Sequence, residues 1–214
     1  VIGAGPIGCE LAQSFARFGS QVFLVEAMHG ILPTEDRDAA DIVEQSLLRD
    51  GVQLLCCGKD LTIRSTNGIK HLSVESHGKQ YDVPVDEILV GVGRSPNIEG
   101  LGLETVGVEY EKSGVKVNNR LQTSNPKIFA AGDICSPFKF THTADAQAQI
   151  VIQNALFPHP FGLGYASTDS LVIPWATYTQ PEIAHVGLYA KYAESKGIPI
   201  DTFTFHLSEV DRAI

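Results

Sequence analysis

Short apolar runs and stretches with helical periodicity alternate at the start of the chain. Val1-Ile2 has the character of a strand end, and apolar side chains between Ile7 and Phe18 recur at helical spacing. Pro6 suits the first helical position, because its missing N–H would have no helical partner there. Residues 21–26, QVFLVE, are almost wholly apolar, as expected of a parallel strand covered on both faces. The pattern predicts a β-α-β unit.

The same alternation continues to about residue 92. An apolar stripe predicts a second helix over residues 35–50, and a strand is expected over residues 52–57. Residues 62–82 break into shorter strand-like pieces around His77-Gly78, which predicts an antiparallel hairpin. Residues 87–92, EILVGV, predict a further buried strand. We therefore expect an α/β domain with a doubly wound parallel sheet and an antiparallel β insert.

A second pattern begins near residue 122. Residues 127–133, KIFAAGD, predict a strand that closes on a Gly-Asp turn. A helix is expected from near Thr143 to a point before Pro158, and a new strand is expected to start at Leu171. We expect a new domain to begin around Ser170.

The composition narrows the classes of partner. The chain is 43% hydrophobic and 19% charged, and its formal net charge is -9 with no block of Lys and Arg. These values disfavour nucleic acid and anionic membrane surfaces as partners. We find neither an apolar run of the roughly 18 residues that span a bilayer nor a signal-peptide pattern. A cytoplasmic protein is therefore expected.

The two ends of the sequence suggest a piece of a longer protein. The chain opens on Val1 without methionine, already inside a predicted strand, and it closes on Ala213-Ile214 without a stop feature. We interpret it as an internal fragment.

The most specific motif is Gly3, Gly5 and Gly8, which form G-x-G-x-x-G between a predicted strand and a predicted helix. The first glycine permits a tight turn, the second lets the backbone approach a pyrophosphate, and the third allows close packing of the helix. The helix N-terminus adds partial positive charge. This context predicts a Rossmann-like domain that binds a dinucleotide.

Two glutamates belong to this unit. Glu26 ends the second strand and is interpreted as the acceptor for the ribose 2′-hydroxyl, so NAD(H) is expected in preference to NADP(H). If NADPH were preferred, His29 and Arg37 would be the candidate phosphate partners. Glu10 lies in the first helix, where it serves either the helix dipole or the nicotinamide end of the ligand.

The four cysteines, Cys9, Cys56, Cys57 and Cys135, show neither zinc-ligand spacing nor the density of a secreted disulfide scaffold. Neighbouring residues on a strand point to opposite faces, so Cys56 and Cys57 are interpreted as structural thiols and not as a redox or metal site. Cys9 is interpreted as a packing residue. We assign no metal ligand.

Five blocks in fixed order point to a family. They are GAGPIGCELAQSFARFGSQVFLVE, GVGRSPN, TSNPKIFAAGDIC, FTHTADAQAQIVIQNALF and IPWATYTQPEIAHVGL. This order resembles the pyridine nucleotide-disulfide oxidoreductases, which include dihydrolipoamide dehydrogenases and mercuric reductases, and the resemblance covers nearly the whole chain. It implies a flavoprotein that transfers hydride from NAD(P)H to FAD and on to a disulfide or related acceptor.

The resemblance also implies a domain division. Residues 1–121 would form the NAD(H)-binding domain, and residues 122–163 would be the returning segment of the FAD-binding domain. Residues 164–214 would start an α+β interface domain, truncated here, that forms a homodimer in the full-length protein.

Further site residues come from the same resemblance. Asp133 would hold the FAD ribitol chain, and the segment with His142, Thr143 and Ala144 would lie along the flavin. From the residues alone, Asp133 is equally a turn residue or N-cap, and His142 a packed side chain. Gly93 and Arg94 match the loop where the two domains rejoin, and Asp60 lies where the family brings its backbone to the adenine. The expected cofactor-binding set is Gly3, Gly5, Gly8, Glu10, Glu26, Asp60, Gly93, Arg94, Asp133, His142, Thr143 and Ala144.

The departures from the family matter equally. No two of the cysteines have the C-x-x-x-x-C spacing of the family's redox pair, and no histidine has a glutamate five positions later. We assign no catalytic residue, and we expect the chain alone to be inactive. Two other functions stay open: a non-catalytic dinucleotide-binding module and a simple NAD-dependent dehydrogenase.

Overall fold

A computed structural model describes residues 1–210. Its helices are α1 (Pro6–Arg17), α2 (Arg37–Arg49), α3 (Thr141–Leu156) and α4 (Ala190–Ser195). Its strands are β1 (Phe23–Val25), β2 (Gln53–Leu55), β3 (Lys59–Thr66), β4 (Ile69–Ser76), β5 (Lys79–Val85), β6 (Tyr110–Glu111), β7 (Gly114–Val115), β8 (Trp175–Thr177) and β9 (Ile183–His185). The predicted interface domain runs to Ile214, and its residues 211–214 lie outside the described range.

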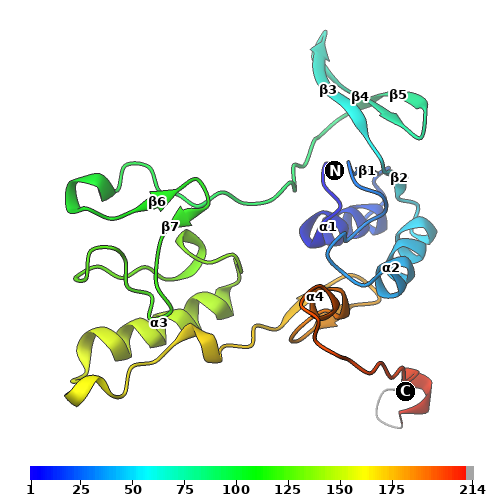
Figure 1. Ribbon diagram of the computed structural model, residues 1–214. Helices are drawn as coiled ribbons and strands as arrows, with labels where there is room; N and C mark the ends of the chain where they lie inside the picture. Colours follow the sequence, from blue (N-terminus) through cyan, green and yellow to red (C-terminus); the bar gives the residue numbers. More distant parts are fainter. Residues whose placement is uncertain (211–214) are drawn as a thin grey trace.

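Parallel pairing organises the first part of the chain. β1 pairs with β2 in parallel, and Ile2 forms parallel bridges to both Val25 and Val90. Backbone bonds support this arrangement, among them Ile2 N–H to Leu89 C=O at 2.8 Å. The prediction of a parallel α/β arrangement with helices is confirmed. Figure 1 shows α1 and α2 packed beside these strands.

The core of this region lies between the strands and the two helices. α1 begins at Pro6 as predicted, and α2 covers residues 37–49 within the predicted 35–50. The buried apolar cluster consists of Ala4, Cys9, Ala12, Val22, Leu24, Ile31, Leu32, Ala40, Val43, Leu47 and Val52. Burying a side chain such as Leu24 contributes about 1.5–3 kcal/mol. The apolar stripes of both helices are therefore the parts that fix the fold around the glycine turn.

The antiparallel insert has one strand more than the predicted hairpin. β4 and β5 pair around His77-Gly78 as expected, and β3 adds to the other edge of β4. β3 is exposed along its whole length, so the alternation of buried and exposed positions that marks a strand is weak there. Leu72 and Val74 bury the inner face of β4. The insert stands away from the helices (Figure 1).

Two predicted strands are reduced to single bridges. The expected buried strand over residues 87–92 is wrong, because only Val90 pairs, and Val90 and Val92 are 62% and 69% exposed. In the 127–133 segment, Phe129 alone bridges to Gln122. Apolar composition predicted burial at both places, but Ile88 is only partly buried against the cluster around Ile2, and in the second segment Gly132 alone is buried.

The second half of the described chain forms separate small units. β6 and β7 make a short antiparallel pair. α3 begins at Thr141, two residues before the predicted start, and it ends at Leu156, before Pro158 as expected. The strand expected to start at Leu171 is wrong: β8 begins at Trp175 and pairs with β9 in a sheet of its own. Pro174 lacks the N–H that a ladder needs, so pairing starts after it.

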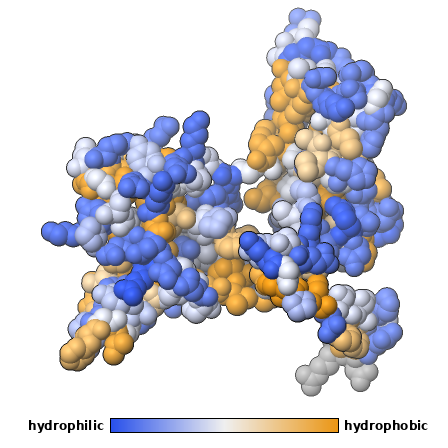
Figure 2. All heavy atoms as spheres, in the orientation of Figure 1, coloured by the Kyte–Doolittle hydropathy of each residue, from blue (hydrophilic) through white to orange (hydrophobic). Residues whose placement is uncertain are grey.

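The surface carries several apolar areas. Figure 2 shows orange patches at the end of α3 and along the segment that leads to β8. They include Phe157, Phe161 and Leu163, which are exposed. Contiguous apolar surface of this kind is typical of contact regions. Among the described residues, no helix combines the length and the apolar character needed to cross a membrane.

Candidate functional site

The three glycines of the turn between Ile2 and α1 have different surroundings, so the physical reason for glycine differs from one position to the next. Gly3 has φ +96°, and a Cβ there would lie 2.6 Å from the carbonyl oxygen of Gly91. A Cβ on Gly8 would lie 1.9 Å from the carbonyl oxygen of Gly3, so a side chain there cannot fit. Gly5 has nothing within 4 Å of the same position. The first and third glycines are thus required by the fold, whereas the second leaves open space above the turn.

The N-terminus of α1 faces this open space without a side-chain cap. Gly5 is the N-cap residue, Pro6 follows it, and no acidic residue lies in the first turn. The first N–H groups of a helix have no intrahelical acceptor and carry the positive end of the dipole. An anionic group of a ligand would satisfy them.

Glu26 lies directly after β1 and is anchored against the glycine turn. Its Oε2 accepts a hydrogen bond from the Ala4 backbone N–H at 2.7 Å, and its Oε1 accepts one from the Met28 N–H at 3.0 Å. The residue is half-buried. A carboxylate has about four acceptor positions, so two backbone bonds leave room for a ligand hydroxyl. The structure therefore brings Glu26 together with the predicted glycines.

Glu10 and Asp60 are placed differently. Glu10 lies on α1 and its Oε1 accepts a hydrogen bond from the Tyr178 backbone N–H at 2.9 Å. It thus binds the segment that follows β8. Asp60 lies near the start of β3, exposed, with φ +51°. Nearby Gly58 packs under Glu26, because its Cβ position is 3.2 Å from the Glu26 carbonyl oxygen.

A second group of predicted residues meets in a cleft of about 770 Å³. Residues 92–96, 112–116 and 135–137 line it together with Lys139. Arg94 Nη1 lies 3.6 Å from Asp133 Oδ2 and donates to the Lys139 carbonyl at 3.1 Å. Gly93, Arg94 and Asp133 are therefore neighbours although they are far apart in sequence. The cleft also contains cationic groups, among them Lys112 and Lys116, and such a lining attracts anions.

The start of α3 adjoins the Gly132-Asp133 turn. A Cβ on Gly132 would come within 3.1 Å of the Ala144 side chain, and the Gly132 N–H donates to Gln147 Oε1 at 2.7 Å. Thr143 is 1% exposed, and its Oγ1 has no hydrogen-bond partner among the described residues. A buried hydroxyl without a partner is costly, which marks this position as one that a ligand could complete. The sequence motifs did not identify Gln147 as the residue that ties the turn to α3.

His142 is held on the outer side of this helix start. Its Nε2 lies 2.7 Å from the Pro174 carbonyl, and its ring stacks on Phe140 with centroids 5.3 Å apart. A packing role and a cofactor-facing role both fit this placement.

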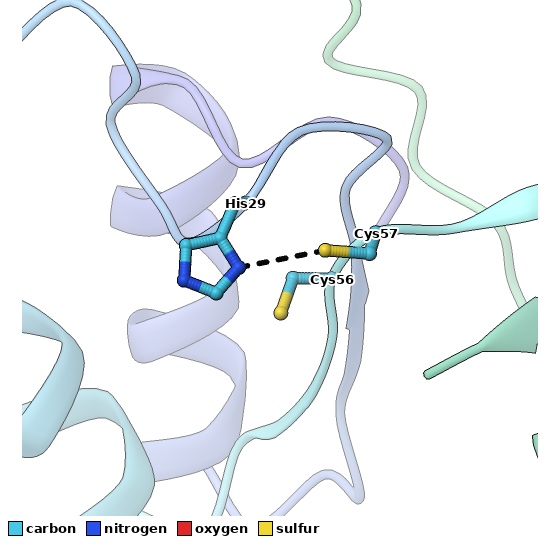
Figure 3. A group of neighbouring side chains, drawn as sticks. All are labelled: His29, Cys56 and Cys57. Atoms are coloured by element: carbon cyan, nitrogen blue, oxygen red, sulfur yellow. Dashed lines mark hydrogen bonds between the residues drawn. The ribbon is translucent and has the colours of Figure 1, made fainter. Parts of the chain in front are cut away.

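The cysteines divide into two kinds. Burial, followed by the charges of Glu26 and Glu10, raises the pKa of Cys9 to about 12, as expected of a packing residue. Burial also raises the pKa of Cys135 to about 11. The inference that Cys56 and Cys57 face opposite sides is wrong. β2 ends at Leu55 and Cys57 has φ +54°, so strand alternation does not apply, and both thiols lie near His29 (Figure 3).

A buried contact that the sequence did not mark joins the start of α2 to the C-terminal segment. Glu35 is 7% exposed and accepts hydrogen bonds from Trp175 Nε1 at 3.1 Å and Tyr189 Oη at 2.6 Å. Burial and the Glu35 hydrogen bond raise the pKa of Tyr189 above its ordinary value. Gln13 adds a second link, because its Nε2 donates to the Gln180 carbonyl at 3.0 Å.

Comparison with known proteins gives a consistent picture. Residues 1–148 match the family described as pyridine nucleotide-disulphide oxidoreductase, and residues 173–214 match the dimerisation domain of the same family. The chain is 35% identical to a dihydrolipoyl dehydrogenase from Thermus scotoductus, covering 100% of this chain and 46% of that protein. It is 34% identical to a mercuric reductase from Staphylococcus aureus, covering 100% of this chain and 38% of that protein.

Solved structures agree with these matches. The HOCl-induced flavoprotein disulfide reductase RclA from Escherichia coli superposes with a TM-score of 0.81 at 31% identity, over 99% of this chain and 47% of that one. LpdA from Mycobacterium tuberculosis gives a TM-score of 0.82 at 26% identity, over 99% of this chain and 45% of that one. The chain thus spans less than half the length of these relatives.

Proposed function

The chain belongs to the pyridine nucleotide-disulphide oxidoreductase family, and from this premise we propose that it supplies the NAD(H)-binding unit and part of the FAD site of a flavoprotein oxidoreductase. The whole protein would transfer hydride from NADH to FAD and pass the electrons to a disulfide or a related acceptor. The observation that carries the proposal is the glycine turn, in which only Gly5 leaves open space and Glu26 is anchored beside it.

The dinucleotide would bind over the turn. The uncapped N–H groups at the start of α1 would donate to its pyrophosphate, and Gly5 would let the backbone approach. Glu26 would accept from the ribose hydroxyls with the acceptor positions that Ala4 and Met28 leave free. Glu10 would stand further along the site, and Asp60 would approach the adenine. These residues bind and orient the ligand, and they carry out no chemical step themselves.

NADH is the expected dinucleotide. The Glu26 carboxylate is fixed by two backbone donors, so a 2′-phosphate at that position would face a like charge that cannot easily turn away. The rival cation Arg37 is engaged elsewhere, since it donates to the Ile31 carbonyl at 2.7 Å and pairs with Asp41 at 3.0 Å. The repulsive element needed for specificity is therefore present, and the Arg37 guanidinium is held by other partners.

The residues around the second cleft fit one part of an FAD site. Arg94 and Lys139 line the cleft and would bind anionic groups of the cofactor, and Asp133 would accept from ribitol hydroxyls. The partnerless Thr143 hydroxyl offers a buried polar contact at the start of α3, and Ala144 and His142 would flank it. When bound, FAD would supply the hydride acceptor, which is chemistry that no side chain provides.

The domain division follows from the same family membership. We propose that residues 1–121 form a Rossmann-like NAD(H)-binding domain, supported by the parallel order Val90, Ile2, β1 and β2. Residues 122–163 would return to the FAD domain. Residues 164–214 would open an interface domain through which the full-length, cytoplasmic protein forms a homodimer, in line with the dimerisation-domain match over residues 173–214.

Substitutions at two of the glycines test the dinucleotide site directly. Gly5→Thr places a side chain in the open space, and Thr is about as good an N-cap as Gly, so the fold should keep its melting temperature. We expect calorimetric titration to show NADH binding by the unmodified chain and at least tenfold weaker binding by Gly5→Thr. The matched variant Gly8→Ala should instead lose stability, because its Cβ meets backbone at 1.9 Å. Unchanged NADH affinity in a folded Gly5→Thr variant would overturn the proposal.

A further inference from the structure

Two cysteines and two histidines form a thiol–imidazole cluster at one end of the parallel strands. It consists of His29, Cys56, Cys57 and His77, and none of the four belongs to the proposed cofactor sites. His29 Nδ1 lies 3.5 Å from Cys57 Sγ, and His77 Nε2 lies 3.1 Å from Cys56 Sγ. The ligand atoms of His29, Cys56 and Cys57 all lie within 4.8 Å of one another. Figure 3 shows the imidazole of His29 directed at the two thiols.

Hydrogen bonds to backbone carbonyls hold the segments that carry the cluster. The Cys57 N–H donates to the Met28 carbonyl at 2.9 Å, which joins the loop after β1 to the end of β2. The Ser76 hydroxyl donates to the Cys56 carbonyl at 2.6 Å, which joins the end of β4, just before His77, to the residues that follow β2. Because three separate segments are fixed around one point, the convergence of the four side chains is a property of the fold.

We propose that this cluster binds one zinc ion through the sulfurs of Cys56 and Cys57 and Nδ1 of His29, with a water molecule as the fourth ligand and His77 hydrogen-bonded to the Cys56 sulfur. Tetrahedral zinc with Zn–S near 2.3 Å and Zn–N near 2.0–2.1 Å places sulfur and nitrogen ligands about 3.5–3.6 Å apart. The observed distance of 3.5 Å between Cys57 Sγ and His29 Nδ1 matches this spacing. The ligand atoms of the three residues are already within 4.8 Å of one another, and closing on the ion would bring them to the distances that zinc requires.

The ligand types favour a transition metal over a hard cation. Thiol and imidazole groups suit zinc, whereas magnesium and calcium require oxygen ligands, and the cluster contains none. On binding, each thiol releases its proton to solvent and the two thiolates neutralise the 2+ charge of the ion, so the loaded site is uncharged. The cysteines are half-buried and the histidines exposed, which gives the ion a route from solvent. The chain's formal charge of -9 also favours the approach of a cation.

Zinc uptake by the full chain under reducing conditions tests the site. Equilibrium dialysis followed by metal analysis should find one zinc per chain, and Cys56→Ser/Cys57→Ser should weaken binding at least about a hundredfold, since loss of an outer-shell partner alone costs 10–100-fold. His77→Ala should also weaken it. The matched controls Cys135→Ser and His206→Ala should keep the full affinity, because both residues lie outside the cluster.

Two measurements on the unmodified chain test the site even if a variant fails to fold. Cobalt(II) in place of zinc should give thiolate-to-metal charge-transfer absorption, and zinc should slow the reaction of Cys56 and Cys57 with a thiol reagent. The proposal is overturned if the cobalt spectrum lacks thiolate bands, if zinc leaves both thiols equally reactive, or if the double serine variant retains wild-type affinity. Retention of copper(I) without zinc uptake also counts against it.

Discussion

Glutamine in place of Glu26 removes one negative charge while changing the shape of the side chain little. In the native chain Oε2 accepts from the Ala4 N–H and Oε1 from the Met28 N–H. Glutamine keeps one of these acceptors and replaces the other with a donor. The substitution therefore weakens the contact to a ribose hydroxyl and abolishes the like-charge repulsion of a 2′-phosphate.

The magnitude follows from the hydrogen bond that the carboxylate offers. A hydrogen bond to a charged acceptor contributes about 1.5–3 kcal/mol, and the lower figure corresponds to about tenfold in affinity. We expect the native chain to bind NADH at least about tenfold more tightly than NADPH. In Glu26→Gln the ratio should fall by a similar factor, with weaker NADH binding and unchanged or tighter NADPH binding. Lower ionic strength should widen the native ratio and leave that of the variant nearly constant.

Calorimetric titration of both reduced cofactors at two salt concentrations measures these ratios. The exposed Glu194 on α4 provides the control, because Glu194→Gln removes the same charge from a residue outside the proposed site and should leave both affinities unchanged. Equal or tighter binding of NADPH by the native chain refutes the assignment and would turn attention to His29 with Arg37. If the Glu26→Gln variant kept the native ratio of NADH to NADPH affinity, a residue other than Glu26 would be the one that distinguishes the two cofactors.

Three further outcomes are expected. The purified chain should be colourless and should not reduce disulfides with NADH, because under the proposal it supplies only part of an FAD site and its sequence has no C-x-x-x-x-C pair. Flavin absorbance at one per chain would contradict this. In the folded chain Cys9 should resist alkylation at pH 8, because its pKa of about 12 leaves almost no thiolate. It should react once urea unfolds the protein, and equal alkylation rates in the two states would be evidence against its burial. Glu35→Ala should cost about 1–3 kcal/mol and shift the emission of Trp175, the single tryptophan, because two partly buried donors lose their acceptor. An unchanged spectrum would argue against this contact.

The parts of the fold with strong local signals were predictable from sequence. The helix starting at Pro6, the second helix and the β4–β5 turn each have a pattern that only one local structure satisfies. Glu26 was found because its spacing from the glycines follows from β-α-β geometry. Burial was less predictable, and none of the residues in the apolar run 87–92 is fully buried, because burial depends on which elements cover a segment.

The thiol–imidazole cluster illustrates a different difficulty. His29 and His77 lie 28 and 21 positions from their cysteine partners, so no spacing motif joins them. The alternation expected for adjacent cysteines failed because Cys57 adopts φ +54° just after β2 ends. A positive φ at a residue other than glycine arises from tertiary contacts, here the bond from Cys57 to the Met28 carbonyl, and sequence periodicity does not encode it.

The central claim is that a reduced dinucleotide binds across the glycine turn beside Glu26. Titration of the isotopically labelled chain with NADH, followed through backbone amide NMR shifts, tests it most directly. The largest saturable shifts should fall on the amides of residues 3–8 other than Pro6, among them Ala4, and on the amide of Met28, which bonds Glu26 as Ala4 does, with α3 little affected. Absence of saturable shifts at the turn, or shifts concentrated at α3 or β8, would contradict the account.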